Sequence, residues 1–233
     1  MRVLRKIRLY ILINRISTFI LILSLVLSTT IVLAESSPKL HQKTPFQSAV
    51  EAIHNLPTDS LSISAIPYCR RYTCYEVIDI AIAENEWEEA TYLLSEKPRT
   101  ARMERALLTE VFSRVEIVLG RITKTQYDIG GTFKVDKLPQ ANSLQLDCVD
   151  EAFNMYVFLN LLKNQGRLHW HDVEGLVHRG WLFDLNYPHT AISMIDKNTH
   201  EKFVIDSWFH DNGRPPELIS LQEWKSGWTP AGF

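Results

Sequence analysis

Glycine, cysteine and long apolar runs are all scarce in this sequence, and each scarcity excludes a class of protein. Only 9 of the 233 residues are glycine, which excludes a collagen-like chain, and neither these nor the 10 prolines gather into a flexible linker. No segment repeats at a period typical of solenoid proteins. A composition with 45% hydrophobic and 22% charged residues indicates a globular protein rather than a disordered or multi-span membrane chain.

Acidic residues are missing from positions 1–34, which carry five basic side chains and the apolar run 19–33. That run is shorter than the roughly 20 residues of a comfortable membrane span, and Ala34 supplies the small residue that a signal peptidase requires. We therefore expect an export signal at residues 1–34, cleaved after Ala34, with an uncleaved anchor in the inner membrane as the alternative. Either outcome makes the rest of the chain periplasmic or secreted.

Without residues 1–34 the chain has 20 basic and 27 acidic side chains, a net charge of −7. No basic arm or patch remains that could hold a phosphate backbone. We therefore expect no nucleic-acid partner.

Three cysteines leave at least one unpaired in an exported monomer. Cys69 and Cys74 are five residues apart, and in an oxidising compartment we expect them to close a small loop. A metal site at this pair lacks a second pair of ligands. Cys148 is then the free thiol, either a small buried residue or a nucleophile.

We divide the exported part into an N-terminal helical region, residues 35–139, and a C-terminal core, residues 140–233. Apolar residues at helical spacing predict one helix over Tyr75–Leu94 and another from Arg99 to about Leu119, after a short helix near Phe46–His54. The apolar side expected for the second long helix consists of Met103, Ala106, Leu107, Val111, Val115 and Val118.

The pattern in the core is a helix followed by short strands. A broadly apolar helix is predicted over residues 148–164. Alternating segments then predict strands, with a turn at Asp196–Asn198 between the last two. Ser220 and Glu223 form a capping box that opens a last short helix near Trp224. The expected strands are 180–185, 190–195 and 202–209.

Three residues of the core have the order of a thiol catalytic site. Cys148 begins the predicted helix, where the helix dipole favours the thiolate and a free backbone N–H could bind an oxyanion. His189 opens one strand and Asp206 lies in the next, each about eight residues from the centre of the turn between them. Pairing of the two strands brings imidazole and carboxylate together, which predicts a nucleophile, a base and an orienting acid.

The segments around these residues resemble a known family. Residues 145–152 (QLDCVDEA), 188–192 (PHTAI) and 204–207 (VIDS) are similar to the transglutaminase-like branch of the papain-like thiol enzymes. They are most similar to the bacterial transglutaminase-like cysteine proteinases, whose pattern is C-x-D-x-A, then H-A-V, then L-D. The resemblance covers about residues 145–209, and Thr190 departs from it by separating His189 from the apolar pair that follows.

This resemblance implies an α+β fold in which a papain-like core packs the Cys148 helix on a small antiparallel sheet. It implies Cys148 as nucleophile, His189 as base and then acid, and Asp206 as orienting carboxylate. The activity implied is that of a cysteine peptidase or amidase acting on a protein or peptide of the cell envelope, with no required cofactor.

Residues beside Cys148 bear on calcium and on the oxyanion. Some periplasmic members of that family depend on calcium held by acids flanking the cysteine. Asp147 and Asp150 are present here, but Val149 occupies a position that is acidic in those members, which argues against calcium. As second oxyanion donor we name the side-chain amide of Gln145, with Asn154 or a main-chain N–H as alternatives.

Other functions stay open on the sequence alone. An amine acceptor in place of water would make the same triad a transamidase, and a protein that kept the fold without the chemistry would be a binding or assembly factor. His169 and His171 could be metal ligands of a hydrolase, although no third ligand stands at a characteristic distance. The tryptophans expected either in the core or along a substrate groove are Trp208, Trp224 and Trp228.

Overall fold

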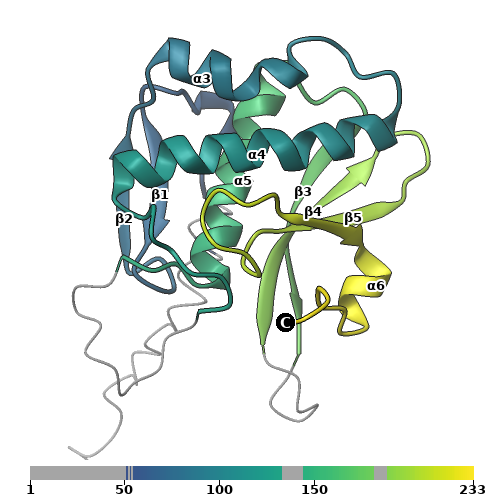
Figure 1. Ribbon diagram of the computed structural model, residues 1–233. Helices are drawn as coiled ribbons and strands as arrows, with labels where there is room; N and C mark the ends of the chain where they lie inside the picture. The colour runs from purple at the N-terminus through teal and green to yellow at the C-terminus, as the bar shows by residue number, and fades with distance from the viewer. Residues whose placement is uncertain (1–50, 52, 54, 133–143, 181–187) are drawn as a thin grey trace, which may run out of the picture. The chain divides into compact units, whose positions relative to one another are not determined.

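Helix α5, Cys148–Asn164, lies at the centre of the fold (Figure 1). Of its 17 residues 13 are buried, because apolar side chains occur all round the helix rather than along one stripe. It packs against strand β1, Ile66–Arg70, and against strands β3, His171–Arg179, and β4, His189–Asp196. The helix predicted over residues 148–164 is therefore confirmed at both ends.

The computed structural model describes residues 51, 53, 55–132, 144–180 and 188–233, which fall in a single unit. Helices and antiparallel strands are mixed in these ranges, so the predicted α+β class is confirmed. The other elements are the 3₁₀ helices Thr58–Ser60 and Tyr92–Leu94, strands β2 (Glu76–Ile80), β5 (Lys202–Asp206) and β6 (Glu217–Ser220), and helices α3 (Glu84–Thr91), α4 (Ala101–Thr123) and α6 (Leu221–Lys225).

Strands β1 and β2 form a two-stranded antiparallel sheet within the region predicted to be helical, residues 35–139. The single helix expected over Tyr75–Leu94 is wrong in its first part, which is strand β2, and α3 begins only after it. Isoleucine occurs at every second position, 78, 80 and 82, which is the period of a strand. Pairing with β1 makes residues 76–80 a strand rather than a helix.

Helix α4 confirms the second predicted helix and extends it by about one turn. The Thr100 side chain caps it by accepting the N–H of Met103. The predicted apolar side is confirmed at Val111 and Val115 but wrong at Met103, which is 44% exposed, and at Ala106, which is also exposed. The buried side is rotated toward Phe112, whose ring lies 5.3 Å from that of Phe158 in α5. The buried apolar residues of α4 are Leu108, Val111, Phe112, Val115 and Leu119.

Strands β3, β4, β5 and β6 form a four-stranded antiparallel sheet in chain order. The predicted pairing around the turn at Asp196–Asn198 is confirmed, since β4 pairs with β5 and Ile195 lies opposite Lys202. Strand β3 is not predicted by the sequence pattern, because its alternation is broken near Gly175, where the register shifts. The strand expected over 180–185 lies outside the described residues except for its first residue. The short helix near Trp224 is confirmed as α6, with Ser220 as its N-cap.

A buried carboxylate of α4 fixes the start of β3. Glu104 has no exposed surface and accepts the backbone N–H groups of His169 (2.7 Å), Trp170 (3.0 Å) and His171 (3.0 Å). His171 Nδ1 lies 2.8 Å from the same carboxylate, and Arg105 donates to His171 Nε2 at 3.0 Å. Burial by itself raises the pKa of Glu104, but these donors hold that pKa below its usual value.

One hydrophobic core contains residues from both predicted regions, residues 35–139 and 140–233. Phe112 of α4, Phe158 of α5 and Ile192 of β4 belong to the same buried cluster. The boundary expected at residues 139–140 lies outside the described residues, as do the expected export signal and most of the helix near Phe46–His54. No helix within the described ranges is long and apolar enough to cross a membrane.

Candidate active site

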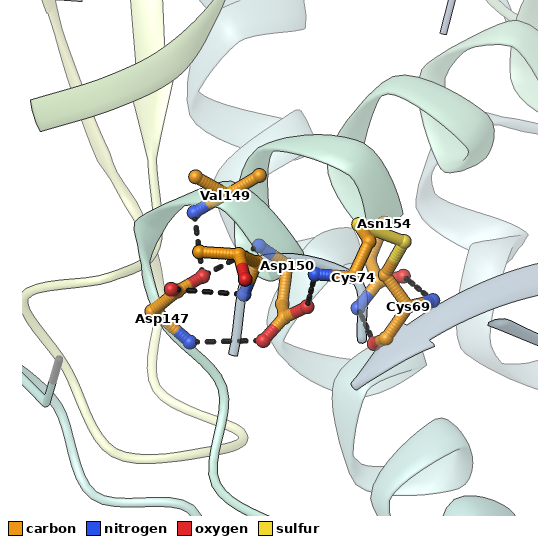
Figure 2. Close-up of a disulfide and its surroundings, with 7 residues drawn as sticks. Cys69, Cys74, Asp147, Val149, Asp150 and Asn154 are labelled. Carbon is orange, nitrogen blue, oxygen red and sulfur yellow. Dashed lines mark hydrogen bonds between the residues drawn. A yellow bond between two sulfur atoms is a disulfide. The ribbon is translucent and has the colours of Figure 1, made fainter. Parts of the chain in front are cut away.

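The residue before Cys148 sets the position of the thiol at the start of α5. Asp147 is the N-cap, and its Oδ1 accepts the N–H groups of Val149 (3.0 Å) and Asp150 (3.1 Å) (Figure 2). In return, Asp150 Oδ2 accepts the Asp147 N–H at 3.2 Å. This reciprocal capping box fixes the first turn of the helix, so Asp147 and Asp150 have a structural role next to the thiol.

A disulfide joins Cys69 to Cys74, as predicted, and the loop that it closes holds the start of α5 (Figure 2). Residues 71–74 all have the left-handed backbone conformation. The Thr73 N–H donates to Asp147 Oδ2 at 2.9 Å, and the Cys74 N–H donates to Asp150 Oδ1 at 2.6 Å. The helix end that carries Cys148 is therefore anchored to the β1–β2 hairpin by backbone donors on two carboxylates.

Cys148 is a free, half-buried thiol, and it lies near enough to the backbone N–H of Thr190 for this group to act on its pKa. Thr190 directly follows His189 at the start of β4. The thiol therefore lies beside the strand end that carries the predicted base.

The surroundings of Cys148 do not favour a thiolate by themselves, so the predicted lowering of its pKa by the helix start is wrong. Burial, followed by the negative charges of Asp147, Asp206 and Asp150, raises the pKa of the Cys148 thiol well above its usual value. The Thr190 N–H is the group that opposes this rise. Release of the thiol proton therefore requires a base within reach.

His189 and Asp206 meet as the strand pairing predicts. His189 Nε2 lies 2.7 Å from Asp206 Oδ2, and the two side chains are 4% and 1% exposed. Because Nε2 donates to the carboxylate, Nδ1 of the neutral ring is an acceptor. Within the described part of the chain, this buried Nδ1 has no hydrogen-bond partner, an arrangement that is uncommon in folded proteins. The rings around the imidazole, with centroid distances of 4.6, 5.3 and 5.6 Å, are Trp208, Phe209 and Trp224.

The side chains and the backbone N–H predicted as oxyanion donors differ in the hydrogen bonds that they already make. Gln145 accepts the N–H of Ile129 (2.9 Å) and donates to the carbonyl of Tyr127 (2.8 Å), so an oxyanion would have to compete with that carbonyl. Asn154 is buried and exchanges two hydrogen bonds with the Cys69 backbone, which occupies the alternative donor. Among the described residues the backbone N–H of Cys148 has no acceptor, and it is the candidate donor that stands at the thiol itself.

Several buried carboxylates surround the start of α5, a feature that the sequence pattern does not predict. Glu151, in the first turn of α5, is buried and accepts the Ser207 hydroxyl at 2.6 Å. Burial and then nearby carboxylates raise the pKa of Glu151 to about 7 and that of Asp128 to about 8. Glu116 of α4 has its pKa raised for the same reasons. These groups bind protons more tightly in the folded protein than in the unfolded chain.

The free energy of unfolding is therefore expected to fall as pH rises from about 5 to 8. A carboxyl whose pKa is raised by folding contributes stability below its unfolded pKa, near 4, and this contribution is lost as the pH passes through the folded pKa. The slope is up to about 1.4 kcal/mol per pH unit for each such group. Thermal melts between pH 5 and 8 measure this slope.

Glu151→Gln removes one of these titrations and should flatten the slope, whereas Glu89→Gln, at an exposed position of α3, should leave it unchanged. A melting temperature that is constant or rises between pH 5 and 8 would contradict the assignment of protons to these carboxyls.

The residues considered for metals are engaged elsewhere. Both ring nitrogens of His171 are used, by Glu104 and by Arg105, so the pair with His169 is not available as a metal site in this structure. Among the described residues the one close group of possible ligands is Cys69, Cys74 and Asp150, and the two sulfurs are joined to each other. A calcium ion at Asp147 and Asp150 would have to displace the backbone donors that these carboxylates accept.

Comparisons with protein-family models, with curated proteins and with solved structures found no significant match for this chain.

Proposed function

We propose that this protein is an exported thiol hydrolase that cleaves an amide or peptide bond through a thioester formed on Cys148. The observation that carries the proposal is the buried Nδ1 of His189, an acceptor for which the described residues supply no donor, on a ring whose Nε2 is held by Asp206. The Cys148 thiol lies near the backbone N–H of the next residue, Thr190. His189 directly precedes Thr190, and its free Nδ1 is the acceptor that we propose for the thiol proton.

The proposed reaction has two halves. In the first, the Cys148 proton passes to His189 Nδ1 while the sulfur attacks the carbonyl carbon, and the Cys148 N–H donates to the oxyanion. The C–N bond then breaks and the imidazolium returns the proton to the leaving amine. In the second, water loses a proton to Nδ1 and attacks the thioester, which releases the acid and restores the thiol. Asp206 holds the ring in the tautomer that both halves require.

The family resemblance of residues 145–209 supports this proposal, as does the packing of α5 on an antiparallel sheet, which a papain-like core requires. The Cys69–Cys74 disulfide supports export to an oxidising compartment such as the periplasm. A protein or peptide of the cell envelope is the proposed substrate.

The test is formation and loss of an acyl-enzyme. The full chain is mixed with p-nitrophenyl acetate, and intact mass spectrometry follows the addition and loss of one acetyl group. Wild type should acquire the group on Cys148 and lose it to water, Cys148→Ala should acquire none at this site, and His189→Ala should acquire it far more slowly. Hydroxylamine added as acceptor distinguishes the transamidase, because an enzyme of that class transfers the acyl group to the amine in preference to water.

A second candidate is a binding or assembly factor of the cell envelope that kept the fold without the chemistry. The observation that favours it is the burial and the raised pKa of the Cys148 thiol. In that protein acetylation of Cys148 would be slow and insensitive to His189→Ala, a result that would remove the hydrolase.

A further inference from the structure

Asp206 has a second hydrogen-bond donor besides His189. The indole Nε1–H of Trp224, in α6, donates to Asp206 Oδ2 at 2.7 Å, the same oxygen and the same distance as His189 Nε2. Trp224 has no exposed surface. Its ring lies 5.6 Å from the His189 ring between centroids. Trp224 is therefore in direct contact with both the proposed base, His189, and the carboxylate that orients it, Asp206.

Trp224 is itself held by Arg179 at the end of β3. Arg179 Nη1 donates to the backbone carbonyls of Trp224 and Trp228, both at 2.6 Å, and its guanidinium lies 4.6 Å from the Trp224 ring centroid. In the pairing of β3 with β4, Arg179 is directly opposite His189. One cation thus fixes α6 to the strand pair that carries the imidazole.

The indole N–H has properties that suit a positioning role. It donates but cannot accept, and it does not titrate, so it favours the ionised carboxylate at every pH and in either protonation state of His189. A buried carboxylate needs such donors to remain charged. Two donors on one oxygen also restrict rotation of the Asp206 carboxylate. The bond from Trp224 therefore helps to keep Oδ2 directed at His189 Nε2.

We propose that Trp224, held in place by Arg179, is a positioning residue that keeps the Asp206 carboxylate aligned with His189 in the thiol reaction. This inference rests on the proposed function, since it assigns Trp224 a part in the same site. Trp224 does not contact the reacting atoms and acts through Asp206.

The experiment compares two tryptophan variants by the pH dependence of Cys148 alkylation with iodoacetamide. Trp224→Phe keeps an aromatic ring in the core and loses one indole hydrogen bond. Trp170→Phe is the matched control, because it loses an indole bond of similar length, 2.8 Å to the Pro98 carbonyl, just before the opposite end of β3. Arg179 lies eight positions after His171 in β3, about 25 Å at the usual rise.

Trp224→Phe should lower the alkylation rate at pH 6 by about 10-fold, because the Asp206 carboxylate loses a charge-assisted hydrogen bond. The acid limb, meaning the rise of the alkylation rate on the acid side of the pH profile, should move upward by about one pH unit. Trp170→Phe should leave both the rate and the limb at their wild-type values. Arg179→Met should move the limb in the same direction as Trp224→Phe, and the double variant should show less than the product of the two effects.

The proposal is overturned if Trp224→Phe and Arg179→Met, folded as judged by thermal melts, keep the wild-type profile, or if Trp170→Phe moves the limb equally. Failure of the proposed function has a different signature. In that case wild-type alkylation is already insensitive to His189→Ala, and no variant changes the acid limb.

Discussion

His189→Ala is expected to slow alkylation of Cys148 by iodoacetamide at pH 7 by about 10²- to 10⁴-fold, the usual contribution of a general base. The reason is that the thiol needs a base to take its proton at this pH. Burial and the charges of Asp147, Asp206 and Asp150 all raise its pKa, so the fraction of thiolate without the imidazole is very small. Rates are measured by intact mass spectrometry on the folded protein.

His210→Ala is the matched control for this variant. His210 is also an imidazole paired with a carboxylate, with Nε2 2.9 Å from Glu217, and no contact links it to Cys148 among the described residues. Its replacement should leave the alkylation rate within about twofold of wild type, well under the 10²-fold contribution of a base. Equal rates in His189→Ala and wild type would show that the imidazole does not receive the thiol proton.

Glu104→Ala is expected to lower the free energy of unfolding by about 3–5 kcal/mol, the cost of removing one partner from a buried charged network. The carboxylate accepts three consecutive backbone N–H groups at the start of β3 and the ring of His171, and neither Glu104 nor His171 has exposed surface. The total free energy of unfolding of a folded domain is about 5–15 kcal/mol. Urea unfolding should therefore reveal the loss clearly.

Glu110→Ala tests the same substitution on the exposed side of α4. Glu110 is 48% exposed and, within the described ranges, pairs with Arg114 alone, so the expected loss is within about 0.5 kcal/mol. If Glu104→Ala were as mild as Glu110→Ala, the buried network would not be what attaches β3 to α4.

The elements that the sequence predicts are those with a strong local signal. Helix α5 has apolar residues throughout and a capping pair at Asp147 and Asp150, and the turn at Asp196–Asn198 fixes the register of β4 and β5. Strand β2 is missed because helical spacing and strand alternation overlap over residues 76–82, and only pairing with β1 decides between them. Strand β3 is missed because Gly175 interrupts its pattern and a side chain of α4, Glu104, fixes its start.

At the site, the sequence predicts the meeting of His189 and Asp206, because both residues lie about eight positions from the centre of the same turn. The acidity of Cys148 was not predictable, because a helix start acts locally whereas burial and the carboxylates around it are products of the tertiary fold. The same holds for Trp224, which lies 18 residues beyond Asp206 and approaches its carboxylate only once α6 has packed on the sheet.

The central claim is that the Cys148 proton passes to His189, and the full pH dependence of Cys148 alkylation in wild type and in His189→Ala tests it most directly. Imidazole titrates near pH 6.5 in peptides, and an isolated thiol near pH 8.5. In wild type, the rate of Cys148 alkylation should already rise with pH below pH 8. This rise should be absent from His189→Ala. Superimposable profiles that rise only above pH 8.5 in both proteins would contradict the account.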